Sequence, residues 1–129
     1  MEAETRLLAL AGDLAALPAG DVVAVALRAL AAAYAPGAPL PRAMAQATLR
    51  SHADKISVLA LAWARERVRL ALEELLMRAP ARGGLPGGAE TRSWLILAAC
   101  EAMALEPPSA VADRLRGLLE LTGHAADPV

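Results

Sequence analysis

Aromatic side chains are almost absent from this chain of 129 residues, which contains no Phe, one Tyr and two Trp. β-Branched residues are scarce as well, with seven Val and two Ile. Strands favour those residue types, whereas Ala and Leu are among the best helix formers. Because the sequence has 33 Ala and 23 Leu, we expect an all-α fold. Intrinsic disorder is excluded too, since disordered chains lack so large an apolar fraction.

The sequence also has little net charge and a single cysteine. Thirteen basic and 14 acidic residues leave a formal charge of −1. Proteins that bind a phosphate backbone are usually basic, so we expect no contact with nucleic acid by this chain. Cys100 cannot form an internal disulfide, and its apolar surroundings predict a buried, unreactive thiol. This cysteine usage fits a cytoplasmic location.

Long hydrophobic runs are missing, so we expect no membrane segment. A span needs about 20 predominantly apolar residues, and the uncharged run over residues 29–41 contains three prolines. No combination of Cys, His and carboxylates has the spacing of a metal site. The glycine pairs at 83–84 and 87–88 lack the strand, lysine and hydroxyl of a phosphate loop. We therefore expect no metal, no cofactor, no catalytic residues and no enzymatic activity.

Glycine and proline divide the chain into five or six helical segments of one domain, residues 1–129. We expect a linker-like helix in residues 1–20, a helical core over 21–123 and an exposed tail over 124–129. The apolar periodicity predicts helices over Ala3–Leu17, Val22–Tyr34, Pro41–His52, Asp54–Ala79, Glu90–Leu105 and Ser109–Gly123. Asp21, Asp54 and Ser109 are the expected N-caps, and Gly123 the C-terminal stop. Gly117, in mid-helix, indicates a close helix contact.

Two of these helices are unusually apolar. Residues 56–64 are apolar on all sides and are expected to be buried on several sides, while the second half of that helix has one apolar face. The helix over 90–105 is apolar nearly all round. Four short neighbours cannot cover both, so we expect a homodimer in which the two helices pair about a two-fold axis. The candidate interface residues are Leu72, Leu76, Trp94, Leu97, Ala98 and Glu101.

Glu101 has two interpretations, since it can pair with an arginine, for example across that interface, or lie on the one wet edge of its helix. A helix bundle can also hold a small apolar ligand between its helices. The candidate lining residues are bulky or adaptable: Tyr34, Met44, His52, Trp63 and Met103. Plain core packing is the alternative for this set, and His52 can equally be a turn or capping residue.

The second half of the sequence resembles the C-terminal domain of the TetR family of transcriptional regulators. A long helix ends with Glu66–Leu76, a glycine-rich turn follows at Ala81–Pro86, and an apolar helix covers Trp94–Ala104. The closing run Leu115–Leu119 is also similar to that family. The resemblance implies dimerisation through a four-helix bundle, two helices from each subunit, and a site for an inducer.

The chain departs from that family at its start, because the first 20 residues are too few for a helix-turn-helix domain and Glu2–Leu17 resembles at most the linker helix. We therefore expect a ligand-sensing and dimerisation domain without a DNA-binding module. The alternative is a stand-alone helical adaptor that binds another protein and has no small-molecule ligand.

Overall fold

The computed structural model describes residues 2–50 and 54–124, and within them the chain is helical and contains no strand. The α-helices are α1 (Glu2–Ala15), α2 (Val22–Ala33), α3 (Pro39–Arg50), α4 (Lys55–Arg78), α5 (Ala89–Ala102) and α6 (Val111–Leu121). Two short 3-10 turns, Met103–Leu105 and Pro108–Ala110, join α5 to α6. The predicted all-α bundle is confirmed, with helix boundaries within a few residues of those expected.

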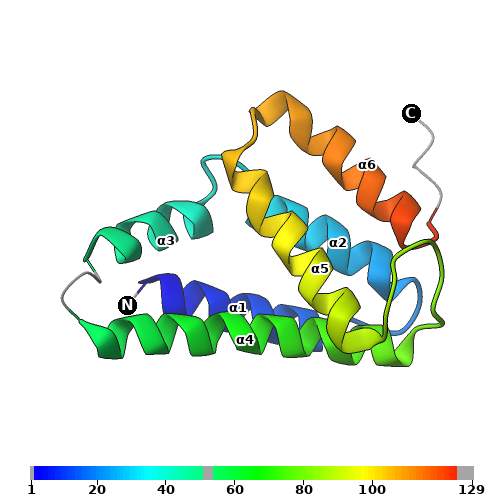
Figure 1. The fold of residues 1–129 in the computed structure, drawn as a ribbon, viewed down its shortest axis with the longest axis horizontal. Coiled ribbons are helices and arrows are strands. Elements are labelled where there is room, and N and C mark those ends of the chain that lie inside the picture. Colours follow the sequence, from blue (N-terminus) through cyan, green and yellow to red (C-terminus); the bar gives the residue numbers. More distant parts are fainter. Residues whose placement is uncertain (1, 51–53, 125–129) are drawn as a thin grey trace.

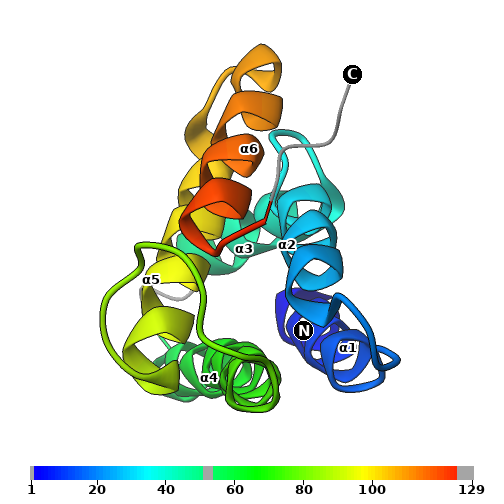
Figure 2. The ribbon, with the colours of Figure 1, turned by 90° about the vertical axis from the view of Figure 1, so that its right-hand side faces the viewer.

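Helix α4 forms the base of the bundle, and α1 lies along it and runs in the same direction (Figure 1). Helix α5 rises from the end of α4 and crosses the bundle, while α2 and α6 lie on the side away from α4 (Figure 2). The ends of α1, α4 and α6 and the start of α2 therefore meet at one end of the molecule.

The main core lies between α1, α2, α4 and α5 and is closed by α6. Its large, fully buried side chains come from all four helices: Leu7, Leu14, Leu27, Leu30, Tyr34, Val68, Leu72, Leu75, Ile96, Leu97 and Cys100. A separate small cluster of Ala3, Ala43 and Ala47 joins α3 to the start of α1. Alanine supplies most of the close helix contacts there, which explains how so few bulky residues can hold α3 in place.

The N-cap of α4 confirms one prediction, and the N-cap of α2 corrects another. The Asp54 carboxylate accepts hydrogen bonds from the backbone N–H groups of Ile56 and Ser57, as the sequence predicted. Asp21 stands at the N-cap position of α2, but its side chain accepts no bond from that helix. Its Oδ1 atom lies instead 2.8 Å from Nε2 of His124, a residue that we expected in an exposed tail.

Glycine ends α6 in the predicted way. Gly123 has a φ of +83°, its N–H donates to the Glu120 carbonyl (3.0 Å), and the His124 N–H donates to the Leu119 carbonyl (2.7 Å). This pair of bonds is the Schellman motif. The start of α6 differs from the prediction, because Ser109 lies within a 3-10 turn and Ala110 is the N-cap. Gly117 has open space beside it, so the predicted close contact is wrong.

The expected burial of residues 56–64 is also wrong. Ile56, Leu59 and Trp63 are 79%, 68% and 56% exposed. The core-facing side of α4 carries Ala64, Val68 and Leu72, all fully buried. The helical period turns the three bulky residues of the first half away from that side, where no other described helix covers them.

Candidate functional site

The residues predicted to line a ligand pocket do not share a cavity. Tyr34 and Met103 are buried in the core, Met44 is half-buried and Trp63 is more than half exposed. His52 lies outside the residues that the structure describes. A shallow hollow of about 350 Å³ between α5 and α6 touches Met103, and none of the other described candidates borders it.

Half of the predicted interface residues belong to the chain's own core. Leu72, Leu76 and Leu97 are at most 4% exposed, because they pack within the main hydrophobic core. They are not available to a second copy, and the interface prediction is corrected at these positions. Trp94 is 54% exposed and Ala98 half-buried, so both remain accessible.

Glu101, the sixth of these residues, pairs with an arginine of its own chain. Arg65 donates from Nε to Glu101 Oε2 and from Nη2 to Oε1, each over 2.7 Å. This two-pronged geometry is the strongest form of arginine–carboxylate contact. It links the middle of α4 to the end of α5, which resolves the sequence's two alternatives in favour of pairing within the chain.

Two titratable groups are buried beside this ion pair. Burial, with a smaller effect of Glu101, raises the pKa of the Cys100 thiol to about 12, so the thiol stays protonated at neutral pH as predicted. Burial also raises the pKa of Tyr34 above its usual range. The Tyr34 hydroxyl has no hydrogen-bond partner among the described residues. Neither group reaches the cavities described below.

A second polar link holds the start of α5 against α4. Arg69 donates to Glu66 Oε1 from Nε (2.8 Å) and to Ser93 Oγ from Nη1 (3.0 Å). Ser93 is fully buried, and its hydroxyl donates in turn to the Glu90 carbonyl over 2.6 Å. Arg69 also lies 3.7 Å from Glu73, which is four residues further along the same helix. These bonds fix the position of the neighbouring Trp94.

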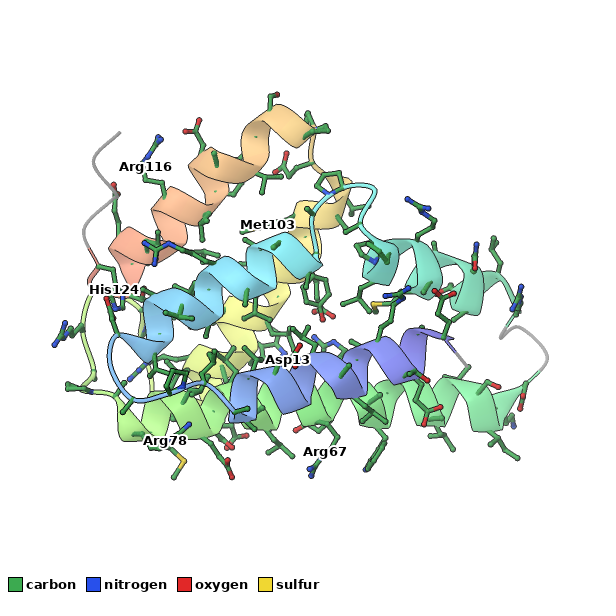
Figure 3. The ribbon with its side chains drawn as sticks, turned by 180° about the vertical axis from the view of Figure 1, so that it is seen from behind. Asp13, Arg67, Arg78, Met103, Arg116 and His124 are labelled. Atoms are coloured by element: carbon green, nitrogen blue, oxygen red, sulfur yellow. The ribbon has the colours of Figure 1, made fainter. Side chains whose placement is uncertain are left out.

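The side of α4 that faces away from the bundle carries a row of apolar residues, interrupted by the charged residues Arg67 and Glu74, and we call it the outer face. Its members recur at steps of three, four and seven residues: Ile56, Leu59, Trp63, Leu70 and Met77. All are exposed except Leu70, which is half-buried. The Arg67 guanidinium lies 5.9 Å from the centre of the Trp63 ring, and its side chain projects away from the other helices (Figure 3). The outer face is the first candidate site.

The second candidate site is a cleft of about 410 Å³ where the ends of the helices meet, which we call the end cleft. Its walls come from four segments: the α1–α2 turn (17–23), the end of α4 with the loop that follows (76–85), Arg92 of α5, and Thr122 and His124 after α6. The sequence analysis missed this site. Its only signal was three arginines, Arg78, Arg82 and Arg92, around a glycine-rich turn.

Glycines hold the wall of the end cleft in place. The Gly84 N–H donates to the Leu121 carbonyl over 3.0 Å. Gly83 has a φ of +78°, and a β-carbon at this position would overlap that same carbonyl group. The loop can therefore lie directly on the end of α6 only because residue 83 has no side chain.

Other kinds of site are not evident. Within residues 2–50 and 54–124, no three His, Cys, Asp or Glu side chains gather as a metal ion would require. No helix of the same ranges is long and apolar enough to cross a membrane. Comparisons with models of protein families, with curated proteins and with solved structures found no match for this chain. The resemblance to TetR-type regulators therefore stays a prediction.

Proposed function

We propose that this chain is a ligand-sensing and dimerisation domain of the kind found in TetR-type regulators, and that two copies pair through the outer face of α4. The observation that carries the proposal is the exposure of Ile56, Leu59 and Trp63 along one side of a helix. Monomeric soluble proteins rarely expose contiguous apolar patches of this kind, which are typical of interaction surfaces.

The spacing of the outer face supports pairing with another helix. Ile56, Trp63, Leu70 and Met77 are seven residues apart, and a seven-residue apolar repeat is typical of helices that pack along one another. Trp94 of α5 lies beside α4, because it lines the same hollow as Glu66 and Arg69. The surface thus extends from α4 to α5, the two helices whose composition predicted a partner.

A second copy is a suitable occupant for this surface. A two-fold interface places the same patch of both subunits together, so an apolar stripe meets an apolar stripe. The formal charge of −1 gives two copies little mutual repulsion. Side chains of both signs, Glu66, Arg67 and Glu74, border the stripe, as in the polar rim of an ordinary interface.

Sedimentation equilibrium at micromolar concentration tests the pairing. We expect the chain to have twice its 13.3 kDa mass, and Leu59→Glu or Trp63→Glu to yield the monomer, because each buries a charge in the interface. Val25→Glu is the matched control. Val25 is a 46% exposed apolar residue of α2, outside the outer face, and its substitution should leave the dimer intact.

Two results would overturn this proposal. A monomeric wild-type chain would favour the alternative of an adaptor whose outer face receives a different protein. A dimer that survives both Leu59→Glu and Trp63→Glu would mean that another surface pairs. Because all three substituted residues are exposed, circular dichroism should show the same helix content in all variants.

A further inference from the structure

The end cleft lies where four segments of the chain converge. Figure 2 looks onto this end of the bundle, with the α4–α5 loop, the end of α6 and the α1–α2 turn surrounding it. Figure 3 labels two of its lining residues, Arg78 and His124, at that same end. A volume of about 410 Å³ is within the range of pockets that hold small molecules.

Positive charge dominates the walls of this cleft. Three arginines line it, Arg78, Arg82 and Arg92, and none of them has an ion-pair partner within the described residues. Elsewhere in the same ranges, arginines such as Arg65 and Arg69 are paired with glutamates. The chain as a whole is slightly acidic, so three unpaired guanidinium groups at one cleft are a local excess of positive charge.

The one carboxylate that lines the cleft, that of Asp21, contacts a histidine. Asp21 Oδ1 lies 2.8 Å from His124 Nε2, and the other ring nitrogen of His124 lies 3.0 Å from the Thr122 hydroxyl. The histidine side chain is only 10% exposed. Asp21 therefore contacts His124, and within the described residues it forms no ion pair with any of the three arginines.

The remaining walls are apolar. Leu17, Val23, Leu76 and Leu85 all line the cleft, and Leu76 and Val23 are buried or nearly so. A cavity with guanidinium groups at some positions and aliphatic side chains at others matches a ligand with an anionic end and an apolar body. Arginine recognises a carboxylate or a phosphate through paired hydrogen bonds.

The start of α2 adds to the positive character. Residues 21–23 belong to the wall, no side chain caps this helix, and its first turn has no acidic residue. The free N–H groups and the helix dipole favour an anion at this position. The glycine contact between the α4–α5 loop and the end of α6 holds another part of the wall in place.

We propose that the end cleft binds a small organic anion, namely a carboxylate or phosphate group attached to a short aliphatic body. This inference rests on the ligand-sensing half of the proposed function, and it replaces the apolar ligand expected from the sequence with an anionic one. The arginines hold the oxyanion, and the leucine and valine side chains cover the aliphatic part.

Isothermal titration calorimetry with octanoate tests the inference, since octanoate combines a carboxylate with a seven-carbon aliphatic body. We expect one site per chain and weaker binding at high salt, because screening reduces the attraction between exposed charges. Arg82→Gln and Arg92→Gln should each weaken binding about tenfold or more, the effect of losing one charge-assisted hydrogen bond. Arg116→Gln is the matched control, because Arg116 pairs with Asp113 on α6 and lies outside the cleft.

Two further ligands separate the head group from the body. Octanol carries a similar aliphatic body without charge, and inorganic phosphate is an oxyanion without a body, so each should bind more weakly than octanoate. Binding of octanol equal to that of octanoate would overturn the anion claim, and equal binding of phosphate would overturn the aliphatic part. Octanoate binding that is absent at millimolar concentration, or unaffected by both arginine substitutions, would overturn the site.

The same samples distinguish this inference from the dimer. The cleft variants should sediment as dimers, and Trp63→Glu should bind octanoate as a monomer. A wild-type chain that dimerises but does not bind octanoate rejects the cleft alone, while a wild-type chain that binds octanoate but remains a monomer rejects the outer face alone.

Discussion

The two ends of α4 differ sharply in what covers them, although apolar residues recur along the whole helix. Around its N-terminal half, Ile56 and Leu59 face solvent. Around its C-terminal half, Leu72, Leu75 and Leu76 are buried, and the helix end forms a wall of the end cleft. Apolar composition therefore does not determine burial in this chain; the neighbouring helices do.

Helix length adds to the effect of the side that each residue faces. Helix α4 has 24 residues, whereas α1 and α5 have 14 each. At a rise of about 1.5 Å per residue, the shorter helices fall roughly 15 Å short of the full length of α4. Helix α5 starts next to the end of α4 and leaves it as it rises (Figure 1). The first half of α4 thus has α1 on one side and no comparable helix on the other.

The largest expected effect is on the free energy of unfolding, when one leucine from each half of α4 is replaced. Both variants are made in the monomeric Trp63→Glu background. Leu72→Ala should lower the free energy of unfolding by about 3 kcal/mol, since Leu72 is fully buried and its truncation leaves a cavity. Leu59→Ala should change it by less than about 0.5 kcal/mol, as is usual at an exposed site. Urea denaturation measures both values, and equal losses would show that the two halves are covered alike.

The next largest effect is the loss of stability when a glycine is replaced in the loop that follows the covered end of α4. Gly83→Ala should cost about 2 kcal/mol or more, because the new β-carbon strains a positive-φ position and meets the backbone of Leu121. Gly84→Ala is the neighbouring control, with open space around it and no positive φ. Thermal melting should separate the two variants, and equal melting temperatures would mean that the loop does not rest on α6.

The sequence predicts where the helices lie along the chain, but not which of their sides are buried by other helices. Apolar periodicity and the Gly/Pro pattern located six segments. As predicted, Asp54 caps the start of α4 and Gly123 ends α6. Periodicity reports which residues share a side of a helix, not whether another helix lies against that side. This is why Ile56 and Trp63 were expected inside, and why Leu72 and Leu97 were assigned to an interface although they fill the chain's own core.

The end cleft was beyond sequence reasoning for a related reason. Its walls come from residues 17–23 and 76–124, and only the tertiary fold brings Asp21 next to His124. The same contact removed Asp21 from the capping role that its position suggested. In the sequence, Gly83 is only part of a glycine-rich turn, whereas in the structure it permits a close backbone contact.

The smallest expected effect is on the melting temperature, when the N-cap residue Asp54 at the exposed end of α4 is replaced. A hydrogen bond from the Ser57 hydroxyl, followed by one from the Ser57 backbone, holds the pKa of Asp54 below its ordinary value. A carboxyl group with a lowered pKa stabilises the fold at neutral pH, and this contribution disappears in acid as the pH falls through that pKa. Asp54→Ala should therefore lower the melting temperature slightly at pH 7 and by less in strong acid, where the charge-dependent part of the stability is lost. Asp54→Asn should retain most of the stability at both pH values, because an amide oxygen can still cap the helix. A loss of equal size at both pH values would show that the charge at this end of α4 contributes nothing.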